Sequence, residues 1–220
     1  MIKNKYKVVI FDLDGTLADT VASIANSVNK SLALVNLPPL PIDVFNHFAG
    51  NGADELIKKS LKASGDENLV HFNAVTKSFR EIFERECMYK VKPFDGIVPL
   101  LQALKEKGIK IAVLSNKIHE RTVDVVKKLF DDRYIDYIQG QVDGMPRKPD
   151  PRGALNIIEK FHVTSKDCIY VGDTDTDMKT GKNANMFTIG VLWGFREKEE
   201  LVEHGADAIV EHPTEILRYF

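Results

Sequence analysis

Residues 7–16 read KVVIFDLDGT. The apolar first half of this segment is rich in β-branched side chains and predicts a strand that is buried on both faces. Packing alone gives such a strand no reason to end in two carboxylates, Asp12 and Asp14, followed by Gly15 and Thr16. Side chains at positions i and i+2 of an extended segment point to the same side. We therefore expect both carboxylates to project from the carboxyl end of the strand, where open α/β sheets bind their ligands.

Two neighbouring carboxylates repel each other and resist joint ionisation unless a cation lies nearby. Asp12 and Asp14 thus indicate a divalent cation that prefers oxygen ligands, and Mg²⁺ fits this description best. The same residues are equally compatible with a strand followed by an ordinary turn, because Asp-Gly pairs commonly form turns. The segment alone does not distinguish these two interpretations, so the remaining chain has to decide between them.

The composition narrows the class of protein. A chain of 220 residues allows one large domain or a core with a smaller insert, and 44% hydrophobic residues suffice for a packed interior. A formal net charge of −2 offers no basic excess for a nucleic-acid backbone. No apolar stretch approaches the roughly 20 residues that span a bilayer, and the first residues lack a signal peptide's apolar region. The only cysteines are Cys87 and Cys168, so we expect no disulfide framework. Together these features predict a cytoplasmic protein with no nucleic-acid or membrane partner.

The stretch after Thr16 has a helical pattern up to about residue 88. Proline and glycine clusters divide it into expected helices over residues 19–36, 43–48, 53–63 and 67–87. We see no strand signal in this stretch. Residues 17–89 are therefore expected to form an α-helical domain that is inserted after the first strand.

From residue 90 onward, strand and helix patterns alternate. Strands are expected over residues 109–114, 134–138, 168–171, 187–191 and 208–210, with helices over residues 97–107, 120–129, 153–161 and from about 176. Such alternation predicts a parallel sheet that is covered by helices on both faces. The expected fold class is α/β: a doubly wound, Rossmann-like core formed by residues 1–16 and 90–220, interrupted by the helical domain.

Polar residues follow other strands in the same way as they follow the first. Ser115 and Asn116 end one strand, and Asp173 ends another, with Asp177 four residues later; Lys148 lies in the linker between these strands. Each of these residues alone fits a turn, a loop or a helix cap. Because the carboxyl ends of parallel strands share one edge of the sheet, these groups are expected to converge with Asp12 and Asp14. This coincidence favours a site over a series of unrelated turns.

The combined set contains the groups that phosphoryl transfer requires. A carboxylate can attack phosphorus to form an aspartyl phosphate, once a divalent cation offsets its repulsion from the anionic substrate. A hydroxyl, an amide and an ammonium can hold the phosphoryl oxygens in the transition state. A second carboxylic acid can protonate the leaving alkoxide and then deprotonate the water that releases phosphate.

In this order, the motifs Asp-x-Asp-Gly-Thr, Ser-Asn, Lys-Pro and Gly-Asp-x-x-x-Asp resemble the four motifs of the haloacid dehalogenase superfamily. The resemblance covers nearly the whole chain and implies that the helical domain is a cap that closes over the site and helps to choose the substrate. It implies that Asp12 is the nucleophile and Asp14 the general acid/base. It also implies that the phosphoryl group is contacted by Ser115, Asn116 and Lys148. The implied ligands of Mg²⁺ are Asp12, the Asp14 main-chain carbonyl and Asp173, and Asp177 would support the metal shell or orient Lys148.

Asp14 also separates branches of this superfamily, because dehalogenases and phosphonate-cleaving members lack it. Residues 50–54, 148–151 and 190–195 resemble the phosphoglycolate phosphatase-like group. The expected reaction is thus Mg²⁺-dependent hydrolysis of a small phosphorylated metabolite, with 2-phosphoglycolate or a similar compound as substrate. Inorganic pyrophosphatase and β-phosphoglucomutase-like phosphotransferase activities stay open as alternatives. A phospho-accepting signalling module is the alternative from another class. Asp14 disfavours it, because a neighbouring acid/base would promote rapid hydrolysis of the phosphorylated aspartate. The oligomeric state, monomer or homodimer, stays open.

Overall fold

The computed structural model of the chain describes residues 5–220, which divide into two compact units. One unit contains the chain up to Ala18 together with Pro93–Phe220, and the other contains Asp19–Lys92. The sequence predicts the boundaries a few residues earlier, at 16/17 and 89/90. Two short strands, β2 (Ala18–Asp19) and β3 (Lys92–Pro93), pair where the chain leaves the first unit and returns to it. Strands of two residues carry no periodic pattern, which is why the sequence did not reveal them.

The first unit is built on a six-stranded sheet with the order β5-β4-β1-β6-β7-β8. All registered pairs in it are parallel. Every residue of β1 is buried, as its continuous apolar run predicts. The strand order reverses at β1, so the predicted doubly wound fold is confirmed. The strands are β1 (Val8–Phe11), β4 (Lys110–Ile118), β5 (Tyr137–Gln141), β6 (Cys168–Gly172), β7 (Phe187–Val191) and β8 (Ala208–Val210).

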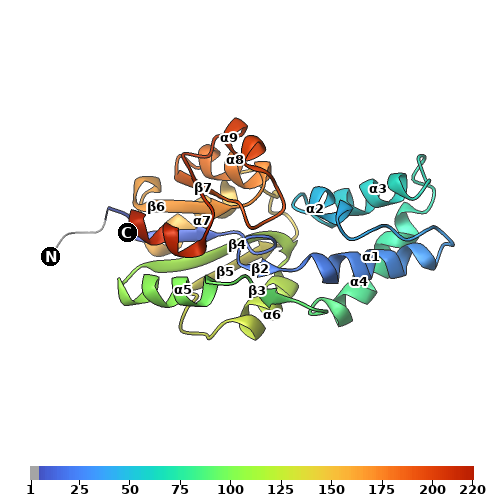
Figure 1. Cartoon of the computed structure of the whole chain (residues 1–220), viewed down its shortest axis with the longest axis horizontal. Coiled ribbons are helices and arrows are strands. Elements are labelled where there is room, and N and C mark those ends of the chain that lie inside the picture. Colours follow the sequence, from blue (N-terminus) through green and yellow to red (C-terminus); the bar gives the residue numbers. More distant parts are fainter. Residues whose placement is uncertain (1–4) are drawn as a thin grey trace. The chain divides into compact units, whose positions relative to one another are not determined.

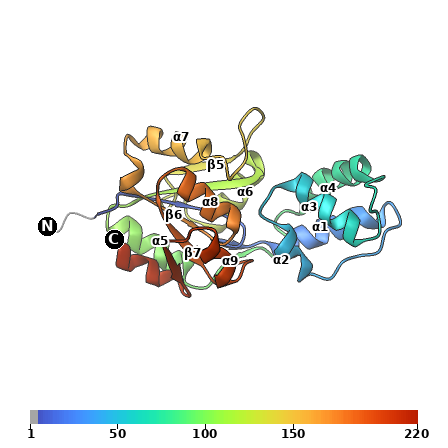
Figure 2. The same ribbon diagram turned by 90° about the horizontal axis from the view of Figure 1, so that it is seen from above.

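Helices cover both faces of this sheet. Figure 1 shows α5 (Ile97–Glu106) and α6 (His119–Leu129) on one side and α8 (Asp175–Asn183) and α9 (Lys198–Glu203) on the other. Right-handed crossovers place α7 (Arg152–Phe161) with the second group. It packs on Ile10 and Tyr170, within one hydrophobic cluster. The short helices η1 (Ser165–Asp167) and η2 (Pro213–Tyr219) complete the unit, and Figure 2 shows η2 beside α5. None of the helices within residues 5–220 has both the length and the apolar character needed to cross a membrane.

Two strands differ from their predicted bounds in a way that matters for the site. β4 does not end at Leu114 but continues through the polar residues to Ile118. Its register with β5 shifts between Leu114 and Ile118, so the extra residues lie beyond the regular ladder. β5 begins later than predicted, at Tyr137. Just before it, the Asp136 carboxylate accepts the main-chain N–H of Ile111 and binds the ammonium groups of Lys105 and Lys110, contacts that a pattern of apolar residues does not reveal.

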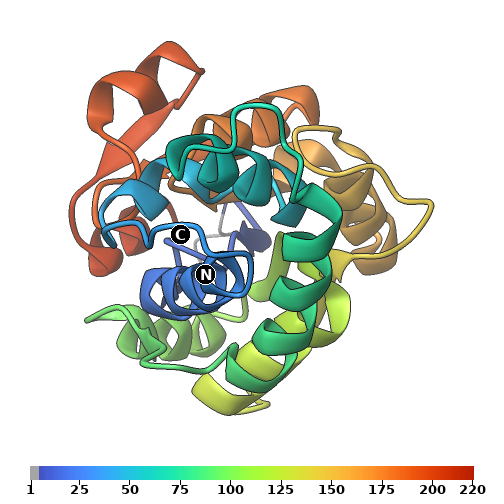
Figure 3. The same cartoon turned by 90° about the vertical axis from the view of Figure 1, so that its right-hand side faces the viewer.

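The second unit consists of four helices: α1 (Val21–Ala33), α2 (Val44–Phe48), α3 (Ala53–Ala63) and α4 (Phe72–Glu86). α1 and α4 lie side by side along their lengths (Figures 1 and 3). Val28, Leu32, Val75 and Phe79 are buried, as expected from their helical spacing. The predicted last helix starts five residues too early, because the Asp66 carboxylate accepts the main-chain N–H groups of the two residues before α4 and holds a turn there.

Candidate active site

The end of β1 turns sharply at the carboxyl edge of the sheet. The main-chain N–H of Asp12 still donates to the carbonyl of Val171 on β6, 2.9 Å away, so Asp12 continues the strand. Asp14 lies in the turn that follows, where Gly15 adopts a φ of 91°. A Cβ at Gly15 would collide with the carboxylate of Asp173. Glycine is therefore required here both by the backbone angle and by the close approach of Asp173.

A buried ammonium group joins two of the predicted aspartates. Lys148 Nζ donates to Asp12 Oδ1 at 2.6 Å and to Asp177 Oδ1 at 2.7 Å. The three side chains are only 4%, 7% and 1% exposed, respectively. Although burial lowers the pKa of Lys148, the charges of Asp12 and Asp177 raise it well above its usual value. Lys148 is thus held as a cation against the Asp12 carboxylate.

Asn116 holds the loop that carries Lys148. Its side-chain oxygen accepts the Lys148 main-chain N–H at 2.9 Å, and its side-chain nitrogen donates to the Lys148 carbonyl at 3.1 Å. The predicted phosphoryl contact of Asn116 stays a prediction. The structure adds a positioning role, because both ends of the amide clamp the main chain of the lysine. Ser115 is also buried beside it, and its hydroxyl accepts the main-chain N–H of Lys117 at 3.1 Å.

Asp173 and Asp177 are fixed by the loop and helix that follow β6. Thr16 Oγ1 donates to Asp173 Oδ1 at 2.7 Å, and the main-chain N–H of Phe195 donates to Oδ2 at 2.8 Å. Asp177 forms a capping box with Thr174 at the start of α8. The capping box can be predicted from the local sequence. The hydrogen bond between Thr16 and Asp173 cannot, because the two residues are 157 positions apart and meet only in the folded chain.

Asp12, Asp173 and Asp177 form a buried group whose ligand oxygens lie within 4.8 Å of one another. Burial, together with the charge of Asp177, raises the pKa of Asp12 well above its usual value and that of Asp173 to about 7. Such carboxylates ionise fully only when a cation compensates them. An all-oxygen, anionic, buried set fits a hard divalent cation such as Mg²⁺. Asp177 adds a third carboxylate to the predicted ligands Asp12 and Asp173, and the main-chain carbonyl of Asp14 stays a predicted ligand.

The Asp14 side chain lies apart from that group. Its Oδ1 accepts a hydrogen bond from the ammonium of Lys117, on β4, and both side chains are mostly buried. Lys117 is not among the residues that the sequence motifs predict for the site. The sequence does place Lys117 two residues after Ser115. Because side chains at i and i+2 of an extended strand point to the same side, this spacing predicts that Lys117 lies on the side of the strand that carries Ser115.

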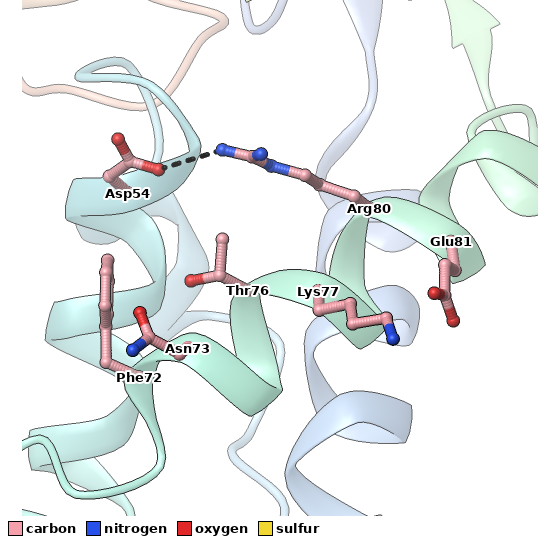
Figure 4. A pocket seen from close by; sticks show the side chains of 7 residues that line it. All are labelled: Asp54, Phe72, Asn73, Thr76, Lys77, Arg80 and Glu81. Atoms are coloured by element: carbon pink, nitrogen blue, oxygen red, sulfur yellow. Dashed lines mark ion pairs between the residues drawn. The ribbon is translucent and has the colours of Figure 1, made fainter.

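The second unit has a groove of its own, with a volume of about 520 Å³. Figure 4 shows Asp54 of α3 facing Arg80 of α4, with an ion pair of 3.7 Å between them. In the same view Thr76 lies below the ion pair, and the ring of Phe72 lies to its left. The lining contains none of the residues that the sequence predicts for the site; it comprises Asp54, Phe72, Asn73, Thr76, Lys77, Arg80 and Glu81.

Comparison with known proteins decides the family. Residues 9–191 match the haloacid dehalogenase-like hydrolase family. The chain belongs to this family. This hydrolase is 33% identical to the phosphoglycolate phosphatase of Agrobacterium fabrum over 203 residues, which cover 92% of this chain and 87% of the relative. It is 31% identical to the phosphoglycolate phosphatase of Aquifex aeolicus over 212 residues, which cover 96% and 95% of the two chains.

Solved structures agree with this placement. A protein from Lactobacillus delbrueckii subsp. bulgaricus superimposes with a TM-score of 0.89 at 31% identity, covering 96% of this chain and 97% of that one. A predicted phosphatase from Clostridium acetobutylicum superimposes with a TM-score of 0.84 at 28% identity, covering 97% and 99%. This hydrolase is therefore an enzyme of the phosphatase type, in the phosphoglycolate phosphatase-like group of the family.

Proposed function

We propose that this hydrolase is a Mg²⁺-dependent phosphatase that cleaves a small phosphomonoester through an aspartyl phosphate on Asp12. The observation that carries the proposal is the Asp12 carboxylate at the carboxyl end of β1, paired with the buried Lys148 ammonium and adjoining Asp173. Because a carboxylate beside a cationic lysine and a buried acidic group supplies groups that phosphoryl transfer requires, the geometry supports transfer to Asp12 better than simple binding.

In the first half of the reaction, an oxygen of Asp12 attacks phosphorus while the bond to the ester oxygen breaks. The bonding electron pair goes to the leaving oxygen, which takes a proton from the Asp14 carboxyl group. In the second half, water gives a proton to Asp14 and attacks the aspartyl phosphate, so that inorganic phosphate leaves and the Asp12 carboxylate is restored. We assign to Lys148, which donates to Asp12, the role of balancing negative charge on Asp12 and the phosphoryl oxygens, and to the hydroxyl of Ser115 a hydrogen bond to those oxygens.

The proposed ligands of Mg²⁺ are the carboxylates of Asp12 and Asp173 and the main-chain carbonyl of Asp14. When bound, the cation would neutralise the repulsion between Asp12 and an anionic substrate. Asp177 is proposed as a supporting residue, because its carboxylate is already engaged by Lys148 and by the hydroxyl of Thr174. It orients the lysine and adds negative charge to the site.

We propose the second unit as the cap that selects the substrate. The relatives named phosphoglycolate phosphatase support 2-phosphoglycolate, or a metabolite of similar size and charge, as that substrate. Cys87 and Cys168 are both buried free thiols, which supports a reducing, cytoplasmic setting.

A substrate panel tests the proposal. The purified protein is assayed for phosphate release from 2-phosphoglycolate, sugar phosphates, nucleotides and pyrophosphate, first with Mg²⁺ and then with excess EDTA. We expect the highest kcat/KM for 2-phosphoglycolate or a close analogue, and loss of release with EDTA. A preference for pyrophosphate would overturn the substrate class. Formation of sugar bisphosphates without phosphate release would indicate a phosphotransferase, and an aspartyl phosphate that persists for minutes would indicate signalling.

A further inference from the structure

Lys117 makes a contact with Asp14 that the four motifs leave unassigned. The Lys117 ammonium donates to Asp14 Oδ1, and the two side chains are only 6% and 14% exposed. An ion pair that is removed from water to this degree restrains both partners more strongly than a surface pair does. The Asp14 carboxylate is thereby held outside the buried group formed by Asp12, Asp173 and Asp177.

The main chain at Lys117 is itself anchored. Its N–H donates to the hydroxyl of Ser115 at 3.1 Å, and its carbonyl accepts the hydroxyl of Thr122, on α6, at 3.1 Å. The register shift in β4 lets the strand continue past Leu114 and bring Lys117 to the carboxyl edge of the sheet. The position of the ammonium therefore follows from a strand and a helix rather than from a freely moving loop.

The two aspartates that follow β1 thus have separate lysines: Asp12 binds Lys148, and Asp14 binds Lys117. We propose that Lys117 is a positioning residue, which orients the Asp14 carboxyl group toward the leaving oxygen and keeps it away from the nucleophile and its neighbours. This inference rests on the proposed role of Asp14 as general acid/base. Without the lysine, Asp14 can rotate, and proton delivery becomes slow while phosphoryl binding is retained.

The identity of the leaving group makes this inference testable. An alkyl phosphate such as 2-phosphoglycolate expels a strongly basic alkoxide and depends on a well-placed acid. An aryl phosphate such as p-nitrophenyl phosphate expels a stable phenolate and needs the acid far less. A residue that only orients the acid should therefore slow the alkyl substrate selectively, whereas a residue that supports the fold or binds phosphate should affect both substrates.

The experiment measures kcat and KM with both esters for the wild type, Lys117→Met, Lys117→Arg and Asp14→Asn. Lys182→Met serves as the matched control, because Lys182 also pairs with an aspartate, Asp207 at 2.8 Å, but on the surface. We expect Lys117→Met to lower kcat for the alkyl ester about 10- to 100-fold and for the aryl ester less than about threefold. Lys117→Arg should recover most of the loss, and Lys182→Met should match the wild type. Circular dichroism and melting temperature verify folding.

A double variant separates this inference from the proposed function. If Lys117 acts through Asp14, adding Lys117→Met to Asp14→Asn should cause little further loss on the alkyl ester. Additive losses, equal losses on both esters, or a change in KM alone would overturn the positioning role while leaving the proposed function standing. Full alkyl-ester activity of Asp14→Asn, or no ester hydrolysis by the wild type, would instead refute the proposed function on which the inference depends.

Discussion

Charged side chains are arranged differently in the two units of this hydrolase. At the sheet edge of the first unit, Lys148, Asp12 and Asp177 are each no more than 7% exposed and bind one another directly. In the helical unit, the ion pair of Arg80 and Asp54 spans 3.7 Å, and its side chains are 58% and 35% exposed. Burying ions costs free energy that apolar packing would not. A cluster of buried charges paired with one another therefore favours a site at the sheet edge, whereas the exposed pair is an ordinary surface interaction.

The largest expected effect is the loss of turnover in Asp12→Asn. Asparagine has nearly the same shape but is a poor nucleophile, so we expect kcat to fall at least about a thousandfold. The fold should remain, because the amide oxygen can still accept the Lys148 ammonium. Steady-state kinetics with 2-phosphoglycolate and the far-ultraviolet circular dichroism spectrum provide the measurement. Near-wild-type activity would eliminate Asp12 as the nucleophile.

The next largest effect concerns the stability of the first unit. Lys148→Met retains a long apolar stem but leaves Asp12 and Asp177 without their buried cation. We expect the free energy of unfolding at pH 7 to fall by about 3–5 kcal/mol in metal-free buffer, as measured by urea denaturation. An unchanged midpoint would mean that the buried carboxylates do not need the lysine for stability.

A smaller effect should appear in the pH dependence of stability. The folded-state pKa of Asp173 is about 7, above its ordinary value of 3.8, so the folded protein binds this proton more tightly than the unfolded chain does. Its stabilising contribution is complete below the unfolded pKa and is lost as pH rises through the folded pKa. In metal-free buffer, urea denaturation between pH 4 and pH 8 should therefore show less loss of stability with rising pH in Asp173→Asn than in the wild type. Identical pH profiles would contradict the raised pKa.

The smallest effect is expected for Arg80→Met in the helical unit. This substitution also removes a cation that pairs with an aspartate, but the pair is exposed to solvent. We expect the free energy of unfolding to change by less than about 1 kcal/mol in the same urea experiment. A loss as large as that of Lys148→Met would remove the distinction between the two regions.

The amount that was predictable differs between the fold and the site. The alternation of strands and helices after residue 90 predicts the sheet, since buried parallel strands show as apolar runs between turn signals. The ends of elements were predicted less well: α4 begins after a turn held by Asp66, and β4 continues into Ser115 and Asn116. At α4 a local polar turn interrupts the helical pattern, and at β4 the strand continues with a shifted register beside β5. Lys117 was missed for a related reason, because a lysine at a strand end ordinarily points into solvent.

By itself, the sequence determined that apolar strands end in carboxylates, a hydroxyl, an amide and a lysine, since strand periodicity and turn chemistry are local properties of the chain. Tertiary structure alone decided how these groups pair. The two aspartates two residues apart lie beside different lysines, Asp12 beside Lys148 and Asp14 beside Lys117, and Asp177 rather than the Asp14 side chain completes the buried acidic group. Those pairings depend on the strand order and on the register of β4 beside β1, which bring together residues more than a hundred positions apart in sequence.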